Sequence, residues 1–239
     1  MAAQRMDVDL ATPPSGSELL IGDESVRRSA TLADQVYAII ARGLLMGAWG
    51  PDERISVPGL AQDLSVSVTP VREAMTRLVN EGALLIGDGR GFRTVRLFRE
   101  QYREIVRIRI ALEPVAAGLA AARITETEIA ALHNRNESLS NAIDRGDFKA
   151  ALEIDTGFHL ALYEIADQPL LASMITSLLL RAGPTRTRLS GKYRKSRIGI
   201  AHHRSLLDAL SARDADAASA AIAADLRDGS NAILSELAQ

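Results

Sequence analysis

The sequence predicts a mainly α-helical protein with one small β-hairpin. Aromatic residues make up only 4% of the 239 residues, while alanine and leucine are abundant, which favours interlocking helices over a sheet-rich fold. Apolar residues recur at helical spacing along most of the chain. The glycine-rich segment Gly87–Gly91 separates two short apolar segments and predicts the hairpin. We therefore expect helices before and after a single hairpin.

The composition excludes several classes of protein. A net charge of −2 is not that of a protein that coats nucleic acid nonspecifically, so affinity for DNA must come from local charge and geometry. The absence of cysteine excludes disulfides and thiolate metal sites. No apolar run approaches the roughly 18 residues that span a bilayer, and the N-terminus lacks a signal-peptide core. We expect a soluble, cytoplasmic protein of one large or two modest domains, with no membrane partner.

Residues 1–29 are predicted to form a flexible tail, because Thr12–Ser17 interrupts any periodicity and few large apolar residues are available for burial. A helix follows and ends near Gly47, before a turn at 48–52. Trp49, the only tryptophan, is expected to pack between this helix and the hairpin. The apolar stripe of the helix consists of Leu32, Val36, Ile39, Ile40, Gly43 and Leu44.

Residues 56–75 predict two short helices joined by a tight turn. Leu60, Ala61 and Leu64 form the inner face of the first helix, and residues 65–67 break the pattern. Helices joined by so short a turn expose the outer face of the second, which is how a helix-turn-helix offers a recognition helix to the DNA major groove. The inner face of the second helix carries Val71, Met75, Leu78 and Val79, and its outer face carries Thr69, Arg72, Thr76 and Arg77.

The hairpin follows the second helix at the position of the wing in a winged helix. Its strands are predicted at Leu84–Ile86 and Phe92–Leu97. Residues 68–97 hold five arginines and three acids, and this local excess of positive charge suits a phosphate backbone. An arginine on a helix is more often simply solvated, but here the helices and the hairpin occur in the right order. The predicted DNA-contacting residues are Ser67, Thr69, Pro70, Arg72, Arg77, Arg90, Gly91 and Arg93.

Beyond Phe98 the sequence predicts an all-α bundle of about six or seven helices. Its first helix is expected at Arg99–Arg123. Thr125 and Glu128 form a capping box that starts the second helix, and Gly146 suits its C-terminal cap. Asp147 caps the third helix. Further helices are expected at 170–181, 192–212 and 214–238, and the apolar face of the first helix is predicted to comprise Ile105, Ile108, Leu112, Val115 and Leu119.

The chain resembles the GntR family of bacterial transcription regulators, in particular its FadR subfamily with an FCD effector domain. The resemblance covers about residues 31–235, with motifs from both halves in the family's order. These motifs are Leu60-Ala61, Ser67–Ala74, Leu78–Gly82, the Gly-Arg-Gly of the wing turn, Arg109–Glu113, Asp155–His159 and His203–Leu210.

The resemblance implies a ligand-responsive regulator, in general a repressor, that is not an enzyme. It implies a winged helix-turn-helix domain at 30–97 and an all-helical FCD domain at 98–239 for effector binding and dimerisation. The protein would bind a palindromic operator as a homodimer and respond to a small carboxylate. Many relatives have arginine at the position of Val68, so Thr69 and Arg72 are expected to carry more of the DNA contact here.

Asp155 and His159 lie four residues apart on a predicted helix, so both side chains project from one face and can chelate a divalent cation. Such a pair is more often a surface pair or a core histidine. Family members with this arrangement bind a metal through one aspartate and three histidines. His203 fits the second histidine position, and Asp225 stands where the third is expected. Either Asp225 ligates, giving a set for Zn, Ni, Mn or Fe that shifts toward harder ions, or the site is weak or empty.

Arg109 occupies a position where the family commonly has an arginine that faces the effector pocket. Its guanidinium could clamp a ligand carboxylate, or it could form a salt bridge with Glu113. Residues 181–197 hold seven basic side chains and no acid, which could attract an anionic effector or DNA but more often form a solvated face. His202 is expected beside the metal ligands or at the surface, and His133 is expected to be exposed.

Two other functions stay open on the sequence. A metal-dependent hydrolase would use the same histidines and aspartates to activate water. No general base or nucleophile accompanies them, however, and an enzyme would not need the winged helix. Alternatively, the helical domain only dimerises and its pocket is degenerate, which Asp225 in place of histidine allows.

Overall fold

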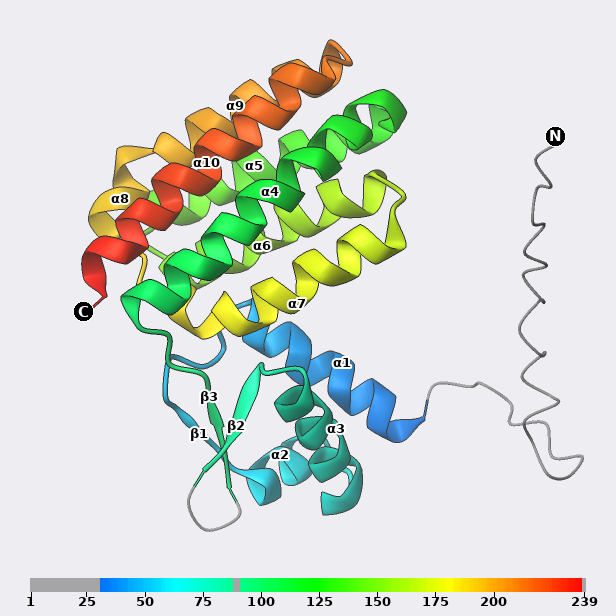
Figure 1. Ribbon diagram of the computed structural model, residues 1–239, viewed down its shortest axis with the longest axis vertical. Coiled ribbons are helices and arrows are strands. Elements are labelled where there is room, and N and C mark those ends of the chain that lie inside the picture. Colours follow the sequence, from blue (N-terminus) through cyan, green and yellow to red (C-terminus); the bar gives the residue numbers. More distant parts are fainter. Residues whose placement is uncertain (1–30, 88–90, 238–239) are drawn as a thin grey trace, which may run out of the picture. The chain divides into compact units, whose positions relative to one another are not determined.

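The computed structural model describes residues 31–87 and 91–237 of the chain (Figure 1). The tail predicted at 1–29 and Arg90 of the predicted DNA-contacting set lie outside these residues. The first helices and the strands are α1 (Leu32–Leu45), β1 (Arg54–Ile55), α2 (Val57–Asp63), α3 (Val68–Asn80), β2 (Leu84–Ile86) and β3 (Phe92–Thr94). The remaining helices are α4 (Arg99–Arg123), α5 (Glu126–Asp144), α6 (Phe148–Ile165), α7 (Pro169–Arg186), α8 (Gly191–Ser196), α9 (Ile198–Ser211) and α10 (Ala215–Glu236).

The helix-turn-helix forms as the sequence predicts. Ser56 caps α2, because its side chain accepts a hydrogen bond from the backbone N–H of Gly59. Ser65, in the turn before α3, has a left-handed backbone with φ of 54°. Helix α3 then buries one face against α1 and α2. The buried residues of α3 are Pro70, Val71, Ala74, Met75 and Leu78.

The predicted hairpin pairs β2 with β3, and the sheet has a third strand that the sequence did not predict. β1 pairs antiparallel with the other edge of β3, so the order is β1-β3-β2. Two residues are too few to show an alternating pattern, which explains why β1 was missed. The expected strand at 92–97 is too long, because β3 ends at Thr94. The Thr94 side chain then accepts a hydrogen bond from the Glu53 N–H and donates one to the Gly50 carbonyl.

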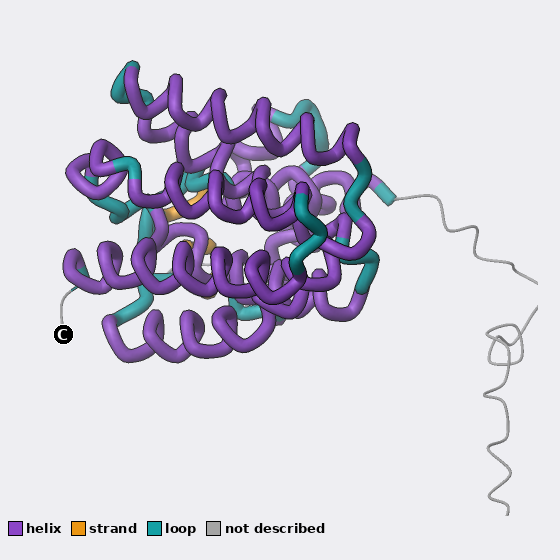
Figure 2. Tube along the Cα trace, turned by 90° about the horizontal axis from the view of Figure 1, so that it is seen from above, coloured by secondary structure: helices purple, strands orange, loops and turns teal. Residues whose placement is uncertain are grey.

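The rest of the described chain is an all-α bundle (Figures 1 and 2). Within it, α4 packs most extensively against α10. α5 packs against α6, and α9 packs against both α5 and α10. The expected single helix at 192–212 is wrong, because Arg197 adopts a left-handed backbone with φ of 61° and separates α8 from α9. The helix expected to end at Arg181 continues to Arg186.

The predicted apolar face of α4 is wrong at three of its five residues, whereas Ile105 is buried and Leu112 is partly buried. Ile108, Val115 and Leu119 are 42%, 52% and 38% exposed, whereas the buried face carries small residues and the Arg109–Glu113 pair. A Cβ on Gly118 would lie 2.8 Å from the Ser219 hydroxyl, so α4 and α10 approach closely there. Small side chains permit this approach, and the larger apolar ones remain outside. The small buried residues of α4 are Ala116, Ala117, Ala120 and Ala121.

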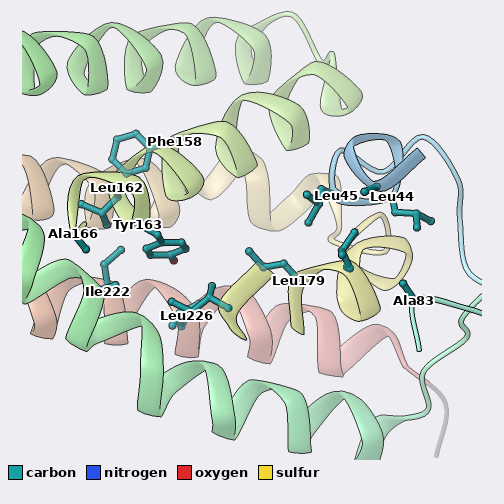
Figure 3. Close-up of a cluster of buried hydrophobic side chains, with 14 of the residues drawn as sticks. Leu44, Leu45, Ala83, Phe158, Leu162, Tyr163, Ala166, Leu179, Ile222 and Leu226 are labelled. Carbon is teal, nitrogen blue, oxygen red and sulfur yellow. The ribbon is translucent and has the colours of Figure 1, made fainter. Parts of the chain in front are cut away.

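One hydrophobic core joins the end of α1 to the bundle. Leu44 and Leu45 pack near Leu179 of α7, as Figure 3 shows, and the same cluster extends to Phe158 and Leu226. A Cβ on Gly183 would lie only 2.3 Å from the Leu44 carbonyl oxygen, so glycine is required where α7 crosses α1. Among the described residues, no helix is long and apolar enough to cross a membrane.

Candidate metal site and DNA-binding surface

Three of the predicted metal ligands converge inside the helical bundle. Asp155 and His159 project from α6, and His203 projects from α9; their donor atoms all lie within 4.8 Å of one another. The Nε2 atoms of the two histidines are 3.3 Å apart. Two imidazole nitrogens that share a tetrahedral ion, each about 2.0–2.1 Å from it, are separated by about 3.3 Å. The two histidines are therefore placed as a pair of ligands to one ion would be.

Asp225, on α10, lies beside this group. Its Oδ2 lies 3.3 Å from His159 Nε2, and the Oδ1 of Asp155 lies 3.7 Å from His203 Nε2. Asp155 and the two histidines form a set of three donors that fits a divalent ion. The aspartate at the position of the family's third histidine lies next to His159, outside this group of three.

Hydrogen bonds behind the ligands orient both imidazoles. His203 Nδ1 lies 3.3 Å from the Asn136 side-chain oxygen, which can only accept, so Nδ1 carries the proton and Nε2 is left for the site. His159 Nδ1 lies 3.3 Å from the Tyr163 hydroxyl, which itself donates to Glu113. The Phe158 ring stacks on His203, with centroids 4.1 Å apart. Sequence reasoning missed Asn136 and Tyr163, although Tyr163 shares the helical face of His159.

Burial and neighbouring charges shift the pKa values of His159, His203 and Asp225. Burial alone would lower the pKa of His159, but its hydrogen bond to Asp225 and the charge of Asp155 outweigh burial and raise that pKa. Burial lowers the pKa of His203 despite the nearby Asp225 carboxylate. Burial opposes ionisation of Asp225, yet the bond to His159 lowers the pKa of this carboxyl overall. Protons and a metal ion therefore compete for His159, because an imidazole must be deprotonated at its ligating nitrogen to bind the ion.

Arg186 is a buried cation beside the site that the sequence did not single out. It is 8% exposed and lies in α7. One of its nitrogens is 2.8 Å from Asp155 Oδ2, and the other donates to the Thr156 hydroxyl at 2.8 Å. Arg194, from the same basic segment, is also buried. The expectation of a solvated face for residues 181–197 is therefore wrong at these two positions, because α7 and α8 turn them toward the bundle.

Arg109 forms the salt bridge that was one of its two predicted roles. Its Nε lies 2.5 Å from Glu113 Oε1, and Nη2 lies 3.2 Å from Oε2. Burial opposes the charge on Arg109, but the Glu113 carboxylate overcomes this and raises the pKa of Arg109 above its ordinary value. Arg109 nevertheless lines the cavity beside the metal ligands, so its position agrees with either role.

That cavity has a volume of about 70 Å³. Its wall includes Asp155, His159, Arg186, Tyr193 and Ser230. The Tyr193 hydroxyl is buried and has no hydrogen-bond partner among residues 31–87 and 91–237. A buried polar group without a partner is costly, so this hydroxyl is a ready contact for a polar ligand.

A larger cleft, of about 600 Å³, lies between α1 and α3 on one side and α6 and α7 on the other. It is lined by Tyr37, Arg77, Glu164 and the α7 hydroxyls Ser173 and Thr176, and neither the three converging donors nor Asp225 is part of its wall. The smaller cavity is therefore the better candidate for a ligand that binds a metal.

The N-terminal end of α3 forms the exposed surface expected to meet DNA. Ser67, Val68, Thr69 and Arg72 are exposed there. Pro70 is buried, so its side chain packs inside the helix-turn-helix and does not lie on this surface. Thr76 donates from its hydroxyl to the Arg72 carbonyl within the helix.

The other predicted DNA-contacting residues have partners within the protein. Arg77 lies 3.4 Å from Asp34 and 3.2 Å from Glu81, and its guanidinium stacks 3.8 Å from the centre of the Tyr37 ring. Arg93 pairs with Asp52 at 2.8 Å, and Gly91 is partly buried. Arg77 and Arg93 would have to exchange these partners for phosphate, whereas Arg72 projects from the exposed start of α3.

Comparisons with known proteins match both parts of the chain to one kind of regulator. Residues 32–94 match the model for bacterial regulatory proteins of the gntR family, and residues 104–228 match the FCD domain. This chain belongs to the GntR family. The two matches together identify it as a GntR-family transcriptional regulator with a DNA-binding helix-turn-helix and an FCD domain, consistent with the FadR-like subfamily.

Named relatives of this GntR regulator are themselves transcriptional regulators. It is 35% identical to the regulator McbR of Escherichia coli over 66% of this chain and 71% of McbR. It is 28% identical to the E. coli repressor RspR over 83% of this chain and 87% of RspR. The solved structure of E. coli McbR matches with a TM-score of 0.76 and 31% identity, over 83% of this chain and 95% of that one. A Rhodococcus GntR regulator, with a TM-score of 0.70 and 21% identity over 86% and 99% of the two chains, shares the fold.

The two remaining histidines of this GntR regulator lie away from the converging donors. His202 Nε2 is 2.8 Å from Asp228, in a pair at the edge of α9 and α10. His133 is exposed on α5, as the sequence predicts. The candidate site therefore uses His159 and His203.

Proposed function

We propose that this GntR regulator is a homodimeric repressor whose helical domain senses a small carboxylate through a bound divalent metal. Residues 30–97 would bind a palindromic operator, and residues 98–239 would dimerise and bind the effector. The observation that carries the proposal is the convergence of Asp155, His159 and His203, with Asp225 beside His159, in a protein that also exposes a recognition helix.

The metal would be held by these four side chains. When bound, the ion would supply a Lewis-acidic point to which a carboxylate oxygen can bind. Two carboxylates among the ligands shift the preference toward harder ions such as Mn relative to a three-histidine set, while Zn and Ni remain suitable. Asn136 and Tyr163 would keep both imidazoles in the ligating tautomer.

The effector would bind in the small cavity beside the metal. The metal and Arg186 would attract the carboxylate of the effector. The Tyr193 hydroxyl would form a hydrogen bond with a polar atom of the effector. Arg109 lines the same cavity and would also attract the carboxylate, while Glu113 balances its charge. A metal-dependent hydrolase would need a general base next to the ion, and the named relatives are regulators, so we favour sensing.

A thermal-shift experiment tests whether the site binds metal. Zinc at about 100 times its dissociation constant stabilises a protein by about 2.7 kcal/mol, which for a chain of this size raises the melting temperature by roughly 5–10 °C. We expect this rise after removal of metal with a chelator, and we expect its loss in His159→Ala. Equal melting temperatures with and without zinc would instead support a helical domain that only dimerises.

The exposed apolar residues of α4 are the surface we assign to the dimer. Ile108, Val115 and Leu119 lie on one side of the helix and are all more than one-third exposed. A second copy that covers them would remove this apolar surface from water, since homodimer interfaces are richer in apolar area than other surfaces. The symmetric use of one helix also fits a twofold operator.

Val115→Glu is expected to separate the dimer. Two symmetry-related glutamates buried at such an interface would repel each other at a cost of several kcal/mol, so dimer affinity should fall by roughly 100-fold or more. Analytical ultracentrifugation measures the change, with Ala131→Glu on the exposed face of α5 as the matched control. A Val115→Glu protein that sediments as the wild type would place the dimer interface elsewhere.

A further inference from the structure

Arg186 and Thr156 lie between the metal ligands and the end of helix α1. The Arg186 guanidinium contacts Asp155 with one nitrogen and donates to the Thr156 hydroxyl with the other, both at 2.8 Å. The Thr156 hydroxyl lies 2.8 Å from the Leu152 carbonyl and 3.4 Å from the Leu45 carbonyl, at the last residue of α1. A continuous series of buried polar contacts thus leads from a metal ligand to α1.

The end of α1 is packed against the same parts of α6 and α7. A Cβ on Gly47 would lie 2.6 Å from Leu152 Cδ2 and 3.0 Å from Thr187 Cγ2. On the other side, Gly183 of α7 meets the Leu44 backbone with no room for a side chain. Because no space separates these backbones, a shift of the Gly183–Arg186 turn must displace the end of α1 or be resisted by it.

Helix α7 also touches the end of the recognition helix. Arg181, five residues before Arg186, donates from Nε to the Glu81 carbonyl at 3.0 Å, at the C-terminal end of α3. Its guanidinium also lies against Gly82. α7 therefore contacts the metal site at Arg186, α1 at Gly183 and α3 at Arg181.

The charges around Arg186 supply a reason for it to move. In the described state the Asp155 carboxylate neutralises Arg186. A divalent ion bound to Asp155 competes for that carboxylate and repels the guanidinium, and a bound anion would attract the guanidinium toward the cavity. Either event breaks the contact between Arg186 and Asp155, which helps to hold the guanidinium beside Thr156.

We propose that Arg186 and Thr156 couple occupation of the metal site to the end of α1, and that α7 carries the displacement to α3. The inference rests on the proposed function, because it requires that the site bind metal. It identifies the positioning residues through which the sensor would act on the DNA-binding surface, although neither residue ligates the ion or touches DNA.

Trp49 is a fluorescent reporter next to the end of α1. It is the only tryptophan, it follows α1, and its ring lies so close to Gly43 that a Cβ there would be 2.6 Å from Cζ3. Zinc titrated into metal-free, full-length protein should change Trp49 fluorescence in proportion to the fraction of sites filled, and calorimetry measures that filling independently. In Thr156→Val the zinc dissociation constant should stay within about threefold of the wild type. The fluorescence change at saturation, however, should fall by more than half.

Thr127→Val, the same exchange at an exposed position of α5, should behave as the wild type. Arg186→Lys is the second variant, because one ammonium can pair with Asp155 but cannot also hold Thr156 in the same geometry. In Arg186→Lys the change in Trp49 fluorescence at zinc saturation should also fall by more than half. A full fluorescence change in either folded variant, or zinc binding by the wild type without any change at Trp49, would overturn the coupling while leaving the metal sensor in place. Failure of the wild type to bind zinc would overturn both the sensor and the coupling.

Discussion

Arg72→Ala is expected to abolish specific DNA binding while leaving the dimer intact. Arg72 is exposed near the start of α3, in the first turns of the helix that a helix-turn-helix inserts into the major groove. Arginine is the side chain that most often reads a guanine, and loss of one such contact costs about 1–3 kcal/mol. Both half-sites of a palindrome lose it at once. Affinity should therefore fall by at least about 30-fold.

Mobility shift on a duplex selected from random DNA by the wild type measures this loss. Arg145→Ala removes an exposed arginine from the turn after α5 and serves as the matched control, since it lies in the helical bundle. Both variants should sediment as the wild type. An Arg72→Ala protein that binds the selected duplex as tightly as the wild type would show that base recognition depends on other residues.

Asp225→His is expected to tighten zinc and nickel binding by about tenfold or more and to change manganese binding little. An imidazole is the better donor for Zn and Ni, whereas Mn prefers carboxylate oxygen. The exchange also removes the carboxylate that raises the pKa of His159, so fewer protons compete with the metal. In the wild type the raised pKa means that zinc affinity falls with decreasing pH from a value above 6.5, the ordinary histidine pKa. In the variant the fall should begin at lower pH.

Calorimetric titrations with zinc and manganese, repeated over a range of pH, separate these effects. Asp228→His is the matched control, because Asp228 lies three residues further along α10 and pairs with His202 instead of His159. A variant that gains no preference for zinc over manganese would show that residue 225 does not ligate. Unchanged pH dependence would show that Asp225 does not govern the protonation of His159.

The parts of the fold that depend on local patterns could be predicted from the sequence. α3 begins at Val68 and α4 spans Arg99–Arg123 as expected, because apolar residues recur at helical spacing along both segments. Features set by distant packing could not. The buried face of α4 is the alanine face, because α10 approaches closely there. The sequence of α4 alone does not show that α10 packs against this face. The break at Arg197 is a single arginine with a left-handed backbone, a conformation that arginine seldom adopts.

The candidate site also combines features set by local sequence with features set by distant packing. Asp155 and His159 are neighbours on one helical turn, so their convergence follows from spacing alone. The approach of His203 and Asp225 depends on how α9 and α10 pack, and was expected only through the family resemblance. Arg186 was hidden within a basic segment in which most of the basic side chains are exposed. Its role emerges only where α7 meets α6 and α1.

The most direct test of metal sensing is the affinity of the wild type for its selected DNA with and without zinc. Coupling between two sites in one protein typically changes affinity by about 5–150-fold. We expect the DNA dissociation constant measured in zinc to differ at least about fivefold from that measured in chelator, and His203→Ala to abolish the difference. The same dissociation constant in zinc and in chelator, for a wild-type protein shown by calorimetry to bind zinc, would contradict metal-dependent regulation.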